Sequence, residues 1–242
     1  MSADDLLKRL QSKIPPDVSP KFTTTEEWKA FQEEQGRMSS QQIIATNRSS
    51  RLNTLMGRSG ISELHKICTF ENYDASTDEQ RSALRKAKSY AADFGSGFGG
   101  FIFSGGCGTG KNHMAAAIGN KLISTGNSVL IATVPDLMMK FRETYRPNSK
   151  MSEADLMNDL CRVGLLVLDD IGVQRDTTSE AVILFQIIDR RLSSKKPVGM
   201  LTNLDQKEMV ALLGERIMDR MRMDGGMWIN FNWSSYRKQV KS

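Results

Sequence analysis

Cysteines and long apolar runs are both scarce in this chain of 242 residues. Its three cysteines, Cys68, Cys107 and Cys161, are odd in number and far apart, which argues against a disulfide framework and predicts single thiols in a reducing compartment. No run of about 18 apolar residues is present to cross a bilayer. Asp4 and Asp5 stand where a signal peptide would carry positive charge, so we expect a cytoplasmic protein with no membrane partner.

The sequence also has few cysteines and histidines that could bind zinc, and only a small excess of positive over negative charge. His65 and Cys68 have ligand-like spacing, but no second pair of cysteines or histidines follows them, so we expect no zinc site. Lysine and arginine number 33 against 28 aspartates and glutamates, a net charge of +5 that permits nucleic-acid or acidic partners without establishing either. With 39% hydrophobic and 25% charged residues, the composition is that of a globular protein and excludes disordered and fibrous classes.

The N-terminal segment differs from the rest of the chain. It is rich in charge, is interrupted by prolines, and carries its apolar residues in helical clusters. Threonines 23–25 offer caps for one of its helices. We therefore expect a small helical N-terminal domain and linker over 1–70 and a second domain over 71–242.

The first 60 residues, called the arm, have little material for a core of their own. Exposed apolar clusters on a small helical module commonly mark an interface with a partner, although such side chains also pack against one another. The candidates for this surface are Leu6, Leu7, Leu10, Trp28 and Phe31.

The second domain alternates short apolar runs with helical patterns. Residues 79–94 read as a helix that Asp78 caps. The runs that follow are apolar at successive positions, as in strands buried on both faces, and segments of helix length connect them. This pattern predicts a parallel α/β sheet with strands at Phe101–Phe103, Val129–Ala132, Leu165–Leu168, Val198–Leu201 and Trp228–Phe231.

A glycine-rich loop lies between the first strand and a helix, which is the context of a phosphate-binding P-loop. Glycines let successive backbone N–H groups point at phosphate oxygens, and the helix N-terminus adds its positive end. Lys111 supplies a charge for the β and γ phosphates of ATP. The residues predicted to bind the nucleotide are Gly105, Gly106, Cys107, Gly108, Thr109, Gly110, Lys111 and Asn112.

Two carboxylates end the apolar run at 165–168. Asp169 is expected to hold Mg²⁺, and Asp170 to activate the attacking water, although paired aspartates also cap turns. Asn112 stands where a P-loop usually has a Ser or Thr hydroxyl for Mg²⁺, and its amide oxygen is a substitute ligand. This departure leaves nucleotide binding intact and predicts weak hydrolysis.

Further polar groups follow the fourth strand. Asn203 ends that strand and suits a contact with water or the γ-phosphate, although asparagines are also common in the turns that end strands. Arg216 and Arg220 lie one helical turn apart on the same face. Such a pair is either a solvated basic face or, beside a P-loop, an arginine finger for a neighbouring subunit.

With these motifs in place, the chain resembles the bacterial replicative helicase loaders of the DnaC/IstB-like family, which are AAA+ ATPases. The resemblance spans the whole length. It rests on GTGKNH at 108–113, LDDIGV at 168–173, LTN at 201–203, GERIMDRM at 214–221 and FNW at 231–233, together with CTFENY at 68–73 and SYR at 235–237.

The resemblance implies an AAA+ core with strand order 5-1-4-3-2 behind a helical N-terminal domain that grips the replicative ring helicase. It also implies a spiral of loaders whose ATP sites lie between subunits. Asn203 then corresponds to sensor 1, Arg220 to the arginine finger with Arg216 beside it, and Arg237 to sensor 2.

An insertion at 135–161 matches the position of the family's extra helical motif that approaches single-stranded DNA. Its cations would track phosphates while its aromatic rings stack on bases. Without the family, the same cluster reads as a mixed amphipathic helix. The candidate DNA-binding residues are Lys140, Phe141, Arg142, Tyr145 and Arg146.

The function expected from these features is an ATP-controlled factor that opens the ring helicase and places it on single-stranded DNA, with an ATPase activity that DNA and partners regulate. A related transposition helper, which binds duplex DNA and a transposase, shares the core and is the first alternative. A P-loop metabolic kinase and an adaptor that binds ATP without hydrolysing it are the others. The arm discriminates between the first two. A kinase would need a substrate pocket and an arginine-bearing lid that acts within one subunit, and nucleotide turnover separates the adaptor.

Overall fold

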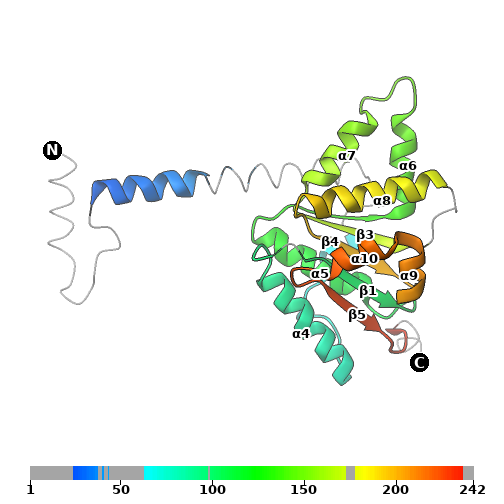
Figure 1. Cartoon of the computed structure of the whole chain (residues 1–242). Helices are drawn as coiled ribbons and strands as arrows, with labels where there is room; N and C mark the ends of the chain where they lie inside the picture. The colour runs from blue at the N-terminus through cyan, green and yellow to red at the C-terminus, as the bar shows by residue number, and fades with distance from the viewer. Residues whose placement is uncertain are drawn as a thin grey trace. The chain divides into compact units, whose positions relative to one another are not determined.

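The computed structural model describes residues 24–37, 40, 43, 63–97, 99–172 and 178–236 (Figure 1). The chain divides into two units, one over 1–44 and the other over 45–242, and each is described by itself. The domain boundary expected near residue 70 stays a prediction.

In the first unit, residues 25–37 form a helix. Thr24 caps it: the Thr24 Oγ1 accepts the Glu27 N–H at 3.1 Å, and the Thr24 N–H donates to Glu27 Oε2 at 3.3 Å. A cap among threonines 23–25 is therefore confirmed. Trp28 is 46% exposed, and Phe31 is half-buried. The arm candidates that lie outside the described residues are Leu6, Leu7 and Leu10.

The second unit is built on a sheet of five parallel strands in the order β2-β3-β4-β1-β5. Read from the other edge, this is the expected order 5-1-4-3-2. Strand β3 runs three residues further than its predicted end at Leu168, so that both aspartates lie within the strand. The strands are β1 (Phe101–Gly105), β2 (Val129–Thr133), β3 (Leu165–Ile171), β4 (Val198–Thr202) and β5 (Met227–Phe231).

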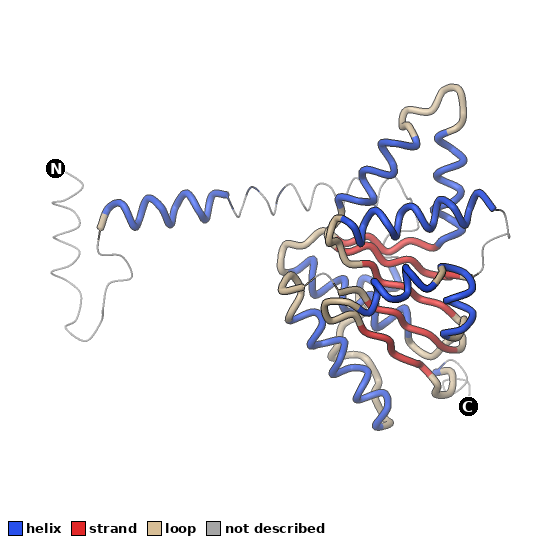
Figure 2. Tube along the Cα trace, viewed as in Figure 1, coloured by secondary structure: helices blue, strands red, loops and turns tan. Residues whose placement is uncertain are grey.

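Helices cover both faces of this sheet (Figure 2). One face packs on α4 (Asp78–Ala92) and α5 (Lys111–Ser124), while α3 (Glu63–Lys66) contacts α5. The other face packs on α6 (Val134–Thr144), α7 (Glu153–Arg162), α8 (Thr178–Ser193), α9 (Gln206–Leu213) and α10 (Glu215–Arg222).

Burial of both faces explains the runs of successive apolar residues. In β1, the Phe101 and Phe103 rings lie in the cluster with α4 and α5, whereas Ile102 lies in the cluster with α6 to α10. Burying each such side chain contributes roughly 1.5–3 kcal/mol. Among the described residues, no helix combines the length and apolar character that a membrane span requires.

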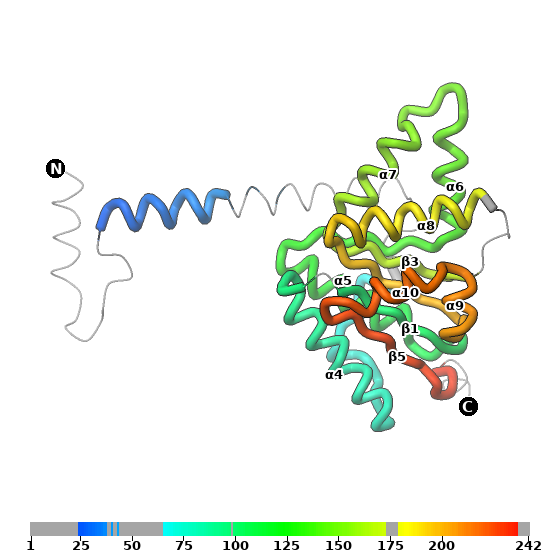
Figure 3. Tube along the Cα trace, viewed as in Figure 1, coloured from blue at the N-terminus to red at the C-terminus, as the bar shows by residue number. Residues whose placement is uncertain are grey.

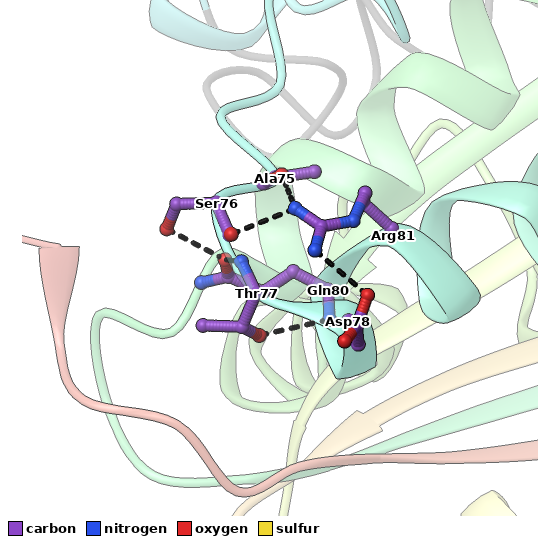
Figure 4. A network of polar contacts seen from close by, with 6 residues as sticks. All are labelled: Ala75, Ser76, Thr77, Asp78, Gln80 and Arg81. Atoms are coloured by element: carbon purple, nitrogen blue, oxygen red, sulfur yellow. Dashed lines mark hydrogen bonds and ion pairs between the residues drawn. The ribbon is translucent and has the colours of Figure 1, made fainter.

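The start of α4 differs by one residue from the sequence interpretation (Figure 4). Thr77 is the N-cap, since its side chain accepts the Gln80 N–H and the Gln80 side chain accepts the Thr77 N–H. Asp78 is the first helical residue and pairs with Arg81 at 2.7 Å. The expected cap at Asp78 is therefore wrong, because the reciprocal pair between Thr77 and Gln80 satisfies two backbone donors at once.

A buried arginine fixes the entry to β3 and β4. The Arg191 guanidinium is fully buried and donates to the carbonyl oxygens of Leu160 (2.6 Å), Val163 (2.9 Å), Gly164 (3.0 Å) and Pro197 (2.7 Å). Burial lowers the pKa of Arg191 to about 10, so the group stays charged at neutral pH. These four bonds hold in place the two strands whose far ends carry Asp169 and Asn203.

Candidate functional site

The predicted P-loop, Asp169, Asp170 and Asn203 meet at the carboxyl edge of the sheet, where parallel strands end on the same side. A pocket of about 660 Å³ lies there. It is lined by the P-loop, by the ends of β3 and β4, by residues near 65–80 and by residues 233, 234 and 236. The colours of Figure 3 follow the chain by residue number through these segments. The site is therefore assembled from segments that are far apart along the chain.

The P-loop has the backbone that its glycines permit. Gly105 and Gly110 have φ of 146° and 95°, and a Cβ at Gly105 would lie 2.4 Å from the Phe231 carbonyl oxygen. Gly110 is also the N-cap of α5 and provides no side-chain hydrogen bond to the first turn. The N–H groups of that turn are thus left for an anion at the positive end of the helix.

Lys111 joins the P-loop to the end of β4. Its ammonium donates to the carbonyl oxygens of Gly105 at 2.6 Å and Gly106 at 2.9 Å, and to Asn203 Oδ1 at 3.0 Å. The Asn203 amide in turn donates to Cys107 Sγ at 3.6 Å. Lys111 is buried, and this burial lowers its pKa. A phosphate bound here would therefore meet a cation that the protein already holds in position.

Asn112 and Asp169 contact each other through a hydrogen bond from Asn112 Nδ2 to Asp169 Oδ2. The other carboxylate oxygen of Asp169 accepts the Asp170 N–H at 2.8 Å. Burial, and secondly the charge of Asp170, raise the pKa of Asp169. A cation would relieve both effects, and carboxylate and amide oxygens are the hard ligands that Mg²⁺ prefers, so these residues fit Mg²⁺.

Asp170 lies next to Asp169 near the end of β3, and its side chain is exposed. It also lines the pocket and has φ of 56°, a left-handed conformation that aspartate and asparagine tolerate better than most residues. Its carboxylate is thus available to a water molecule in the pocket, in contrast to the buried Asp169.

The sequence interpretation missed two hydrogen bonds that residues after β5 donate to the P-loop. Trp233 Nε1 donates to the Thr109 carbonyl at 2.8 Å, and the Tyr236 N–H donates to the Gly108 carbonyl at 3.0 Å. The sequence feature that could have indicated these bonds is Trp233, an aromatic residue that follows the last strand. Arg237, the predicted sensor 2, lies outside the described residues.

Arg216 and Arg220 do not line the pocket formed by the described residues. Arg220 donates to Asp189 Oδ1 at 2.7 Å and to Ser193 Oγ at 3.1 Å, and its side chain is 23% exposed. The Arg216 side chain is 75% exposed and lies 3.8 Å from the same carboxylate oxygen. Because neither arginine reaches the nucleotide site of its own chain, the finger role in a neighbouring subunit stays a prediction.

One candidate DNA-binding residue requires correction. Phe141 is completely buried in the core against the sheet, so its ring is not available to stack on a base. Lys140 and Arg142 each lie near a glutamate carboxylate, at 3.0 and 3.6 Å, while Tyr145 and Arg146 are exposed. The candidates whose side chains are exposed are therefore Arg142, Tyr145 and Arg146, which lie at the end of α6 and just after it.

Comparison with known proteins agrees with this geometry. The family model described as IstB-like ATP binding protein matches residues 24–242. The replicative helicase loader DnaC of Escherichia coli (strain K12) is 50% identical over 236 residues, which cover 98% of this chain and 96% of the relative. The corresponding protein of Buchnera aphidicola subsp. Acyrthosiphon pisum (strain APS) is 48% identical over 237 residues, with 98% and 96% covered.

A solved structure shows the same fold. The crystal structure of the DnaC helicase loader superposes with a TM-score of 0.61 at 19% identity and covers 70% of this chain and 99% of that one. The expected AAA+ α/β architecture is thus confirmed. From the family match and the two close relatives, we conclude that this chain belongs to the DnaC family of replicative helicase loaders and carries an IstB-like ATP-binding domain.

Proposed function

We propose that this protein is an ATP-dependent loader that binds the replicative ring helicase and delivers it onto single-stranded DNA during initiation or restart of replication. The observation that carries the proposal is the pocket in which Lys111 joins the P-loop to Asn203 beside the contact between Asn112 and Asp169. The similarity to DnaC over 98% of the chain connects this pocket with helicase loading.

Each residue of the pocket has a role in handling ATP. The P-loop N–H groups and the start of α5 bind the phosphates, and Lys111 supplies positive charge to the β and γ phosphates. Asp169 and Asn112 would hold Mg²⁺, which neutralises phosphate charge when bound. Asp170 accepts a proton from the attacking water, and Asn203 orients the γ-phosphate. Hydrolysis is slow and responds to DNA and the helicase.

The direct test mixes the full-length protein with the replicative helicase of its host, with and without ATP, and measures the mass of the complex. A stable complex of the two proteins supports loading. Binding to duplex DNA and a transposase, with no helicase complex, would support the transposition helper instead. Transfer of phosphate to a small molecule would support a kinase.

Removal of the arm separates helicase recognition from ATP binding. We expect the fragment 61–242 to lose helicase capture and keep ATP binding, because the arm contains none of the phosphate-site residues and Trp28 is 46% exposed on it. A pull-down compares the fragment with the full chain, and ATP titration reports whether the fragment is folded. Equal capture by both would place recognition in the ATPase core.

Arg220→Ala should bind ATP but lose turnover stimulated by DNA, because the proposed finger acts on the nucleotide of the neighbouring subunit. Mixing Arg220→Ala with Lys111→Ala subunits should restore part of the activity, since some interfaces then pair an intact P-loop with an intact finger. Arg222→Ala is the matched control, because this arginine lies on the same helix, is exposed and pairs with Asp219 of that helix at 3.5 Å. No recovery at any mixing ratio, in assemblies of confirmed mass, argues against action in trans.

A further inference from the structure

The segment 63–73, called the connector, is fastened to the P-loop helix α5 at two points. At the first, the side-chain amide of Asn120 donates to the carbonyl oxygens of His65 (3.0 Å), Lys66 (3.2 Å) and Cys68 (2.8 Å). Two of these carbonyls belong to the last residues of the one-turn helix α3, and the His65 carbonyl also accepts the Cys68 N–H at 3.1 Å. Asn120 thus caps the end of α3 from a different helix.

His113 makes the second attachment. Its Nε2 lies 3.1 Å from the Thr69 carbonyl oxygen and 2.9 Å from Asn72 Oδ1. The Asn72 amide is oriented by two other bonds, because its Nδ2 donates to the Ile67 carbonyl at 2.7 Å and its Oδ1 accepts the Thr69 N–H at 2.8 Å. Both partners of His113 Nε2 are therefore acceptors, so this nitrogen carries the proton and donates.

These attachments lie beside the nucleotide pocket. His113 is two residues after Lys111, and its ring meets the Tyr73 ring edge-on with centroids 5.3 Å apart. Tyr73 in turn packs against the P-loop, since a Cβ added at Gly110 would lie 3.0 Å from its ring. His65 and Asn72 line the pocket together with Tyr73. The connector is thus one wall of the pocket and also the route of the chain towards the arm.

Burial of apolar side chains alone does not determine the position of the connector relative to α5. Phe70 and Tyr73 of the connector are buried against the core, but hydrophobic contact is non-directional and permits small shifts along α5. The hydrogen bonds from His113 and Asn120 are directional and reach four backbone carbonyls of the connector. They set the position of the wall relative to Lys111.

We propose that His113 and Asn120 are positioning residues that hold the connector against the P-loop helix and couple nucleotide binding to the connector. This inference rests on the proposed ATP site. Because coupling between two sites is reciprocal, whatever displaces the connector lowers ATP affinity, and bound ATP orders the connector.

The test uses His113→Phe and Asn120→Asp in the full-length protein. The first keeps an aromatic ring beside Tyr73 without the N–H donor, and the second presents a carboxylate to three carbonyl oxygens. We expect each variant to raise the Kd for ATP about tenfold, or ~1.4 kcal/mol. We also expect hydrogen exchange of residues 65–73 to lose the protection that ATP gives in the parent protein.

Two further variants, a rescue at His113 and a control at Asn127, test whether the effect comes from the hydrogen bonds to the connector. His113→Gln restores an N–H donor, so its ATP affinity should return towards the parent value. Asn127→Asp makes the same change as Asn120→Asp after the end of α5, where the amide donates only to Thr125 Oγ1 at 3.2 Å, and should have no effect. Unchanged ATP affinity and exchange in both test variants, or an equal effect from Asn127→Asp, would overturn the proposal. A parent protein that binds ATP without capturing helicase would instead contradict the loader function alone.

Discussion

Lys111→Ala is expected to raise the Kd for ATP by about 100-fold or more while the protein stays folded. The change removes the cation held between Gly105, Gly106 and Asn203, and a hydrogen bond to a charged group contributes roughly 1.5–3 kcal/mol. Loss of about 3 kcal/mol of binding energy corresponds to two powers of ten in affinity. The apolar clusters on both faces of the sheet do not include Lys111, so the core remains.

Nucleotide titration and circular dichroism measure this prediction. Lys121→Ala is the matched control, because Lys121 lies in the last turn of the same helix, is exposed and does not line the pocket. Its affinity for ATP should equal that of the parent protein. If folded Lys111→Ala binds ATP as tightly as Lys121→Ala, the phosphate site lies elsewhere.

Much of the sheet could be predicted from local sequence, because strands buried on both faces must be apolar at successive positions. All five predicted runs lie within observed strands. Strand β3 was underestimated because Asp169 and Asp170 are polar, and the backbone continues through them to Ile171. The cap of α4 was misplaced because Thr77 and Asp78 are both good caps, and only the side chain of Gln80 decides between them.

The residues of the site were predictable from local motifs, but the contacts that folding makes between distant residues were not. The loop 105–112 and the aspartates of β3 follow local motifs. The bond from Lys111 to Asn203 joins residues 92 positions apart, and the Trp233 contact with the P-loop spans 124 positions. No pattern in the sequence encodes the geometry of such pairs.

The error at Phe141 had a signal in the sequence. The buried residues of α6 are Val134, Leu137, Met138 and Phe141, which follow the spacing of one helical face. Phe141 completes that apolar face, whereas the family resemblance drew attention to its position among cations. Helical periodicity was the better guide here, because the core requires a large apolar side chain at this point.

Asp170→Asn should reduce ATP hydrolysis by about 100-fold or more and leave ATP affinity within about a factor of two. The loss reflects removal of a general base, whose contribution is typically 10²–10⁴-fold. Asparagine is nearly isosteric and tolerates the φ of 56° found at Asp170, so the backbone need not change. Removing the neighbouring negative charge also removes one of the two causes that raise the pKa of Asp169, so the change favours the ionised form that Mg²⁺ requires.

Asp224→Asn provides the matched control for this variant. Asp224 is also exposed and has φ of 48°, but it lies outside the nucleotide pocket, so the same chemical change at the same type of backbone should leave turnover unaltered. Single-turnover hydrolysis, measured with the protein in excess over ATP and concentrated enough to bind all of it, in the presence of DNA and helicase, separates the chemical step from binding. Equal rates for Asp170→Asn and Asp224→Asn would assign the base to another group, because the only difference between the two variants is the place of the lost carboxylate.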